Sequence, residues 1–232
     1  MNTVVEQNQL DVQLSKATKR AIKFIPLYIA VPVLFGVGFL LSGFAIDWKA
    51  FGLGALGWVI ALFLRGPISA AVMRMPQERV KAIMIACSGI LEEITRVVLL
   101  ALTSFGSTWA LSVGQGWAAV EVLYVIVQII AISSLAGRTD DKAMQAKQML
   151  ESTGNLQASP LWGILERVWA SAFHIGCTLI AASFPWMVIV LVPLHSGVNW
   201  AGVSLAAKSI RMSSMAIAII GIAVLVAGLA LM

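Results

Sequence analysis

Long apolar stretches limit what this chain can fold into. A helix needs about 20 mostly apolar residues to cross the hydrocarbon core of a bilayer. We expect seven such helices in the 232-residue sequence, at residues 24–45, 50–64, 82–105, 109–135, 161–183, 185–207 and 213–232. Only 12% of the residues are charged, whereas soluble domains contain about 25%. The sequence therefore predicts an all-α, polytopic bundle of transmembrane helices.

The distribution of Lys and Arg predicts the orientation of this bundle. The net charge is +5, and most basic residues fall in four segments that the seven spans leave on one side: 1–23, 65–81, 137–160 and 208–211. Lys49 is the one basic residue expected on the other side. Because basic loops stay in the cytoplasm, we expect a cytoplasmic N-terminus and an outer C-terminus in the cytoplasmic (inner or plasma) membrane. The sequence shows no basic face or stripe of the kind that binds nucleic acid.

The predicted domain organisation is simple. Residues 1–23 form a polar cytoplasmic tail, and residues 24–232 form a single transmembrane domain with a cytoplasmic loop at 137–160. Within that loop, Thr139 could cap a short helix that ends at Gly154-Asn155, although a solvated linker is an equal alternative. Two cysteines fall in apolar stretches and are expected to be buried thiols: Cys87 and Cys177.

Eight ionisable residues remain inside the predicted spans. They are Glu92, Glu93, Arg96, Glu121, Glu166, Arg167, His174 and His195. A charge at the centre of a membrane helix costs about 2.5 to 3.5 kcal/mol, so these groups must be paired, protonated or hydrated. A helix rises about 1.5 Å per residue, which places Glu92, Glu93, Glu121, His174 and His195 near one depth. Such a set predicts a polar chamber at mid-membrane, although any single member could be a structural hydrogen-bonding group.

Local spacing suggests how these residues pair. Glu92 and Arg96 are four residues apart, so we expect them to form an ion pair on one helix face. Glu93 should point about 100° away, towards another helix or a buried hydrogen bond. His195 and Asn199 also share a face. Glu166-Arg167 lies near the cytoplasmic end of its span, where a structural ion pair or snorkelling is expected.

These residues resemble the motifs of a known family. Leu91-Glu92-Glu93-Ile94-Thr95-Arg96 resembles the Glu-Glu-x-x-Arg motif of the YhfC-like glutamic intramembrane peptidases, which stand within or beside the CPBP (Abi) superfamily of type II CAAX prenyl proteases. The segment from Gly114 to Glu121 resembles a Gly-His-Gly motif with a following Glu, with Gln115 in place of the His. Glu166-Arg167 with His174, and His195 with Asn199, resemble the remaining motifs.

Two departures from the prenyl proteases favour the YhfC-like branch. Those enzymes carry Glu-Glu-x-x-x-Arg, whereas Arg96 comes one residue sooner here. They also carry Phe-x-x-x-His, whereas Ala170 stands where that Phe would be.

The resemblance implies hydrolysis of a peptide bond within the membrane. Glu92 would be the general base, oriented by Arg96, and His174 would help to hold the attacking water. His195 and Asn199 would donate to the oxyanion. Glu93 would be a supporting hydrogen-bond partner, while Gln115, Glu121, Glu166 and Arg167 would lie further out.

Cofactors and alternatives follow from the same residues. The resemblance implies no cofactor, and zinc held by Glu92, His174 and His195 is the second choice. The expected partners are a membrane protein or peptide substrate and the lipid bilayer, without nucleic acid. A proton-coupled transporter and a catalytically silent binder of membrane proteins are the alternatives. Gln115 motivates the silent binder, because it removes an ionisable group.

Overall fold

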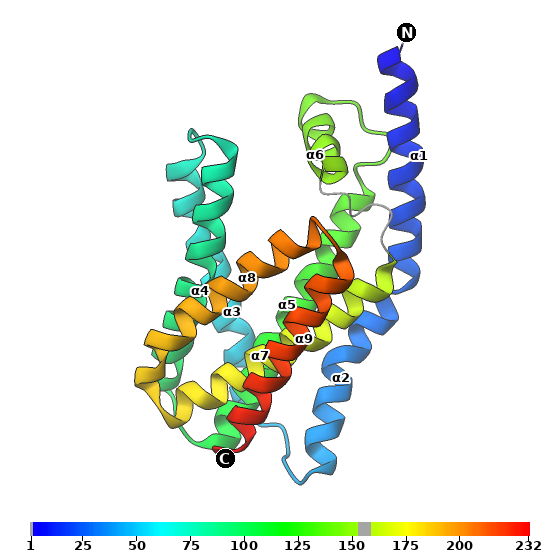
Figure 1. Cartoon of the computed structure of the whole chain (residues 1–232). Coiled ribbons are helices and arrows are strands. Elements are labelled where there is room, and N and C mark those ends of the chain that lie inside the picture. The colour runs from blue at the N-terminus through cyan, green and yellow to red at the C-terminus, as the bar shows by residue number, and fades with distance from the viewer. Residues whose placement is uncertain (1, 153–158) are drawn as a thin grey trace.

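The structure, a computed structural model, describes residues 2–152 and 159–232, and the described chain is helical without strands (Figure 1). The predicted all-α class is therefore confirmed. The helices are α1 (Asn2–Lys23), α2 (Ile25–Leu41), α3 (Trp48–Val72), α4 (Gln77–Leu102), α5 (Ser107–Ser133), α6 (Asp141–Ser152), α7 (Pro160–Ser183), the 3₁₀ turn η2 (Pro185–Met187), α8 (Val188–Ala206) and α9 (Ile210–Leu229).

Six helical segments of the described chain are long and apolar enough to cross a membrane. They are Leu10–Leu41, Trp48–Val72, Ser107–Ser133, Pro160–Ser183, Pro185–Ala206 and Ile210–Leu229. These segments make the chain an integral membrane protein. Helix α4 has 26 residues but is not among the six, because several charged side chains lie close together along it. The count of seven spans and the orientation of the termini stay predictions.

Two helices differ from the sequence-based expectation. Helix α3 continues through Pro67 to Val72, so the predicted end of that span at residue 64 is wrong. A proline removes one backbone hydrogen bond but does not end a helix that its neighbours support. Residues 2–23, expected only as a polar tail, form helix α1.

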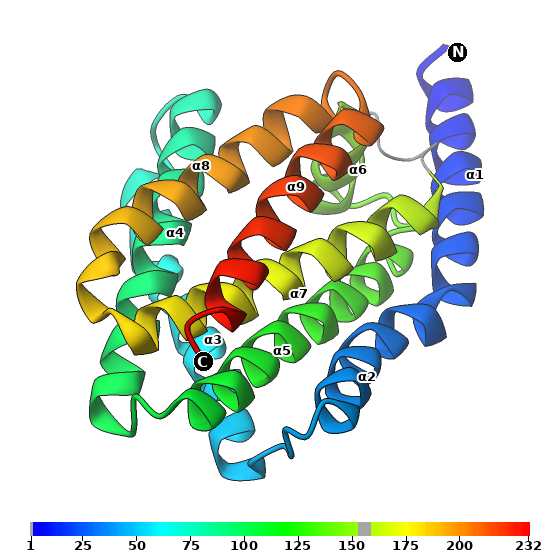
Figure 2. The same cartoon turned by 60° about the horizontal axis from the view of Figure 1, so that its bottom comes forward.

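Helices α5 and α7 form the centre of the molecule. Helix α7 packs against α9 and α5, and α3 packs against both α5 and α4 (Figure 2). Helix α8 crosses α4 and returns to α9. Every residue from Ser171 to Ala182 is buried, so α7 is enclosed by protein over half of its length. Polar side chains within this buried part of α7 therefore face other helices rather than lipid.

Glycines allow the central helices to approach closely. A Cβ atom on Gly116 of α5 would lie 1.9 Å from the Phe51 carbonyl oxygen of α3. A Cβ atom on Gly176 of α7 would lie 2.4 Å from the Val224 carbonyl oxygen of α9. Small residues at helix contacts are the usual means of close packing in membranes, where the surrounding lipid is as apolar as leucine.

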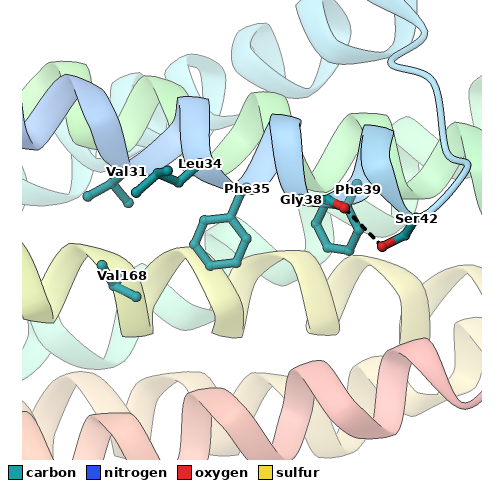
Figure 3. A pocket seen from close by; sticks show the side chains of 7 residues that line it. All are labelled: Val31, Leu34, Phe35, Gly38, Phe39, Ser42 and Val168. Atoms are coloured by element: carbon teal, nitrogen blue, oxygen red, sulfur yellow. Dashed lines mark hydrogen bonds between the residues drawn. The ribbon is translucent and has the colours of Figure 1, made fainter.

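A groove between α2 and α7 is apolar. Its volume is about 320 Å³, and Figure 3 shows Phe35 and Phe39 pointing from α2 towards α7. The lining residues are Val31, Leu34, Phe35, Gly38, Phe39, Ser42 and Val168. The one hydroxyl among them, on Ser42, donates to the Gly38 carbonyl oxygen of its own helix at 2.9 Å. No titratable group lines the groove, so chemistry must be sought elsewhere.

Helix α6 forms within the predicted cytoplasmic loop and is tied to α1. Asp140, rather than Thr139, accepts a hydrogen bond from the first turn, through the Ala143 N–H at 3.2 Å. The Lys147 ammonium donates to Asp11 of α1 and to the Arg138 carbonyl oxygen, each at 2.5 Å. The solvated-linker alternative is therefore wrong for residues 141–152. The predicted end at Gly154-Asn155 lies outside the described residues.

We expect replacement of Gly176 by alanine to destabilise the protein. The added methyl group meets the α9 backbone, and overpacking of this kind costs about 1 to 3 kcal/mol. Thermal unfolding in detergent should show a lower midpoint for Gly176→Ala. Gly52→Ala on α3, where a Cβ meets nothing within 4 Å, is the matched control and should be unchanged or slightly stabilised. Equal midpoints for the two variants would contradict this account of the α7–α9 contact.

We also expect the α6 cap to persist in mild acid. The hydrogen bond from Arg138, followed by that from the Ala143 N–H, holds the pKa of Asp140 below its usual value of about 3.9. A lowered folded-state pKa means that the cap contributes above the usual value and is lost only as the pH falls through the lowered one. An NMR titration of the Asp140 carboxyl should show the pKa rising towards its usual value in Arg138→Gln. An unchanged titration would contradict this role for Arg138.

Candidate active site

In the part of the chain that the structure describes, three carboxylates inside the helical bundle each pair with a guanidinium of another residue. Arg65 of α3 pairs with Glu92 of α4, Arg96 of α4 pairs with Glu93 at 3.1 Å, and Arg167 of α7 pairs with Glu121 of α5 at 2.5 Å. Both members of the second pair are fully buried. Each of the three carboxylates thus has a guanidinium partner, and the formal charges cancel when both histidines are neutral. A buried charge without a partner would be far more costly.

The pairing differs from the predicted one in two respects. Arg96 pairs with Glu93 three residues earlier, not with Glu92, so the expected Glu92–Arg96 pair is wrong. Arg65, assigned from the sequence to a cytoplasmic loop, donates to Glu92 instead. The reason is the continuation of α3 beyond Leu64, which carries Arg65 alongside α4.

Arg96 connects α4 to the two central helices. Its guanidinium donates to the His174 carbonyl oxygen at 3.0 Å and to the Thr178 hydroxyl, both on α7. It also lies over the Trp117 ring of α5, 4.3 Å from the centroid. A further guanidinium nitrogen lies 3.1 Å from His174 Nδ1. Because arginine only donates hydrogen bonds, Nδ1 must accept, and the proton of neutral His174 is on Nε2.

Glu121 accepts a hydrogen bond from Nε2 of His174, the nitrogen that carries the proton. His174 Nε2 lies 2.6 Å from Glu121 Oε2, so it donates to the carboxylate. The other Glu121 oxygen accepts from Arg167, whose guanidinium also contacts Glu166 at 2.6 Å. The expected Glu166–Arg167 ion pair is therefore present. Arg167 extends it inward, so that Glu121 is held between Arg167 and His174 and fixes the orientation of the imidazole.

His195 is oriented by Glu93. Its Nδ1 lies 2.7 Å from Glu93 Oε1, and Glu93 also accepts from Arg96. An ionised carboxylate only accepts, so the proton of neutral His195 is on Nδ1. The lone pair of Nε2 is then directed elsewhere, and this nitrogen lies 3.8 Å from Glu92 Oε2.

The centre of the site is Glu92 Oε2. His195 Nε2 lies 3.8 Å away and His174 Nδ1 lies 3.9 Å away, while the Trp117 indole N–H donates to the same oxygen at 3.2 Å. Glu92, His174 and His195 are each at least 95% buried. Separations of 3.8 to 3.9 Å are too long for direct hydrogen bonds, but one water oxygen can contact both groups. The predicted convergence of Glu92, Glu93, Glu121, His174 and His195 is thus present in the structure.

Two predicted residues lie apart from this centre. Asn199 donates through Nδ2 to the Ser88 hydroxyl of α4 at 2.7 Å, and within the described chain it forms no hydrogen bond with Glu92 or either histidine. Gln115 is buried, and its Oε1 has no hydrogen-bond partner among the described residues. Of the ten predicted site residues, the structure therefore joins eight in one contact network and leaves these two outside it.

Three residues of the network are not predicted by the sequence patterns: Arg65, Trp117 and Thr178. Arg65 falls in a segment that was expected to be a loop. Spacing could have indicated the last two, since Trp117 is four residues before Glu121 and Thr178 is four residues after His174. In each case the two side chains lie on one helix face.

Comparisons with known proteins give no relative. No family model matches the chain, and neither the curated proteins nor the solved structures contain a match. The class that the fold and site define is a helical integral membrane protein with a buried Glu/His/Arg network. Any narrower function has to be argued from these residues.

A metal ion is one possible occupant of the site. Glu92, His174 and His195 each offer one ligand atom, and these atoms lie within 4.8 Å of one another. Two imidazoles and a carboxylate form a known zinc ligand set. His195 suits this role, because a carboxylate on Nδ1 directs Nε2 towards a metal. His174 suits it less well, because the guanidinium of Arg96 already contacts Nδ1.

We expect Glu93→Gln to destabilise the protein much more than Glu166→Gln. The first substitution leaves the fully buried Arg96 without a counter-charge, and breaking a buried pair costs about 3 to 5 kcal/mol. The second breaks the pair between Arg167 and Glu166, whose side chain is 39% exposed. Ion pairs at exposed positions contribute about 0 to 1 kcal/mol. Denaturant unfolding in detergent micelles measures both free energies. Similar losses in the two variants would show that burial does not set the importance of these pairs.

Proposed function

We propose that this chain is an intramembrane endopeptidase of the glutamic type, which hydrolyses a peptide bond of a membrane-associated protein or peptide. One observation carries the proposal. Glu92 Oε2 and Nε2 of His195, which carries no proton in the neutral imidazole, lie 3.8 Å apart inside a buried site. Two acceptors at this separation can each take a hydrogen from one water molecule, whose oxygen lone pairs then remain available for attack. The ordered motif resemblance supports the same activity.

The residues of the site account for the transfer of the proton from the attacking water. The water oxygen attacks the peptide carbonyl carbon, and the proton moves to Nε2 of His195. Glu93 stabilises the resulting imidazolium through its contact with Nδ1 at 2.7 Å. The imidazolium then gives this proton to the amide nitrogen as the C–N bond breaks, which leaves a carboxylic acid and an amine. In this scheme His195 transfers the proton, in contrast to the oxyanion-donor role expected from the motif.

Glu92 in this scheme is an ionised, fixed acceptor that orients the water. Arg65 and the Trp117 indole contact its two oxygens, one each. The single N–H of Trp117 is already used by Glu92, so the donor left for the negative charge that develops on the carbonyl oxygen is Arg65, whose buried Nε has no partner among the described residues. Donors fixed before the reaction stabilise such charge without reorganisation.

Zinc is a second candidate for the same residues. The spacing of the Glu92, His174 and His195 ligand atoms favours it, whereas the contact of Arg96 with His174 opposes it. Elemental analysis of protein purified without chelator separates the two mechanisms. A stoichiometric metal ion whose removal abolishes cleavage would support zinc, and cleavage by metal-free protein would support the water mechanism.

A proton-coupled transporter is the competing class. Polar contacts run from the half-exposed Glu166 through Arg167 and Glu121 to His174. Arginine remains protonated, however, so Arg167 interrupts this chain as a route for protons. Proton flux into liposomes that disappears with Glu121→Gln would favour transport over hydrolysis. A silent membrane-protein binder would show neither flux nor cleavage.

We expect Glu92→Gln and His195→Gln each to lower the cleavage rate of a membrane-spanning peptide by about 10² to 10⁴. A residue that transfers the proton, as His195 does in this scheme, usually contributes about 10² to 10⁴. Loss of the acceptor that positions the water, as in Glu92→Gln, costs about 10². Glu78→Gln, an exposed position on the same helix, is the matched control and should retain full activity. The measurement is kcat of purified protein in detergent or liposomes. Unchanged cleavage in either site variant would refute the mechanism.

A further inference from the structure

Helix α1 carries a basic stripe along one face. Its four basic residues, Lys16, Lys19, Arg20 and Lys23, are spaced i, i+3, i+4 and i+7 and all four are exposed. On a helix of 3.6 residues per turn, this spacing places them within about 100° of one another. The expectation of a sequence without a basic face is therefore wrong for this segment, because residues 2–23 are helical.

The opposite face of α1 fixes the direction of the stripe. Leu10, Leu14 and Thr18 are buried, and Asp11 is tied to Lys147 of α6. Helix α1 packs against α5 and lies at the edge of the molecule beside α6 in both views (Figures 1 and 2). The basic stripe thus faces outward and not into the protein.

The stripe has no counter-charge within the described protein. None of its four residues forms an ion pair with any described side chain. This contrasts with Lys147, Arg138 and Arg167, each of which has a carboxylate partner. Four exposed cations on one face repel one another, and an external anion would relieve that repulsion.

The position of the stripe identifies that anion. Lys23 directly precedes the apolar residues that begin with Phe24, and the stripe rises about 10 Å from there to Lys16. The headgroup layer on each side of a bilayer is about 5 to 8 Å thick. For a helix that stands perpendicular to the membrane and enters the hydrocarbon at Phe24, the lower part of the stripe lies at headgroup depth. The upper part is then within one Debye length, about 8 Å, of the surface.

We propose that the outward face of α1, formed by Lys16, Lys19, Arg20 and Lys23, binds the phosphate headgroups of anionic phospholipids and so holds the α1–α6 unit at the membrane surface. Juxtamembrane groups of basic residues attract anionic lipid, and each residue near the surface contributes about a fivefold factor. The binding is independent of the proposed peptidase activity. Loss of one therefore leaves the other intact.

Native mass spectrometry of the purified full chain in neutral detergent tests this binding. Phosphatidylglycerol and phosphatidylcholine with the same acyl chains are the probes. We expect the wild type to retain phosphatidylglycerol at least about tenfold more tightly, and K16Q/K19Q/R20Q/K23Q to lose that preference. The matched control, R74Q/R79Q/K81Q/K208Q, removes the same charge from exposed positions on other elements and should keep the preference. Equal loss in both variants, or no preference in the wild type, would overturn the proposal.

Further measurements separate lipid binding from an effect on membrane insertion and from binding of a soluble anion. Basic residues also orient membrane insertion, so the charge-preserving variant K16R/K19R/R20K/K23R should retain the preference in its native orientation. For the wild type alone, the preference should fall as NaCl rises from about 50 to 500 mM, because screening weakens binding at an exposed surface. Displacement of phosphatidylglycerol by an equal concentration of polyglutamate would instead identify a soluble acidic polymer as the ligand and overturn the lipid assignment.

Discussion

The burial of charge within an apolar bundle is the constraint on which this structure depends. Glu92, Glu93 and Arg96 are buried on one helix, and none can remain inside the protein without a partner. The partners come from different helices. Arg65 is on α3, His195 is on α8, and the acceptors for Arg96 are on α7. Satisfying the charges of α4 therefore requires that these helices pack against it.

The same network gives the site its chemical asymmetry. Each imidazole contacts one carboxylate through a single ring nitrogen. His174 contacts Glu121 through Nε2, and His195 contacts Glu93 through Nδ1. The tautomers are consequently opposite. His174 Nδ1 is directed towards Arg96, whereas His195 Nε2 retains a lone pair near Glu92. This difference between two chemically identical side chains makes His195 the better proton acceptor. It follows only from which neighbouring groups donate hydrogen bonds and which accept them.

Much of the fold was predictable because hydrophobic stretches specify helices in a bilayer whatever their partners. All seven expected spans correspond to helices, and the ionisable residues expected at one depth meet in one network. The partner of each charge was not predictable. Two candidates for Glu92 were available, Arg96 on its own helix and Arg65 on another, and local spacing favoured the wrong one. The length of α3 decided the outcome, because its continuation through Pro67 depends on neighbouring helices.

The sequence by itself determined that a lipid bilayer surrounds the chain, that the chain is helical, and which residue types form the buried polar network. These features follow from composition and from the rise of a helix per residue. It also determined that the basic residues gather before the first apolar stretch. The tertiary structure decided which guanidinium meets which carboxylate, which nitrogen of each histidine carries the proton, and that Asn199 is directed to Ser88. It decided as well that the basic residues of α1 face outward. These features depend on contacts between helices that are distant in the sequence, and no local pattern specifies such contacts.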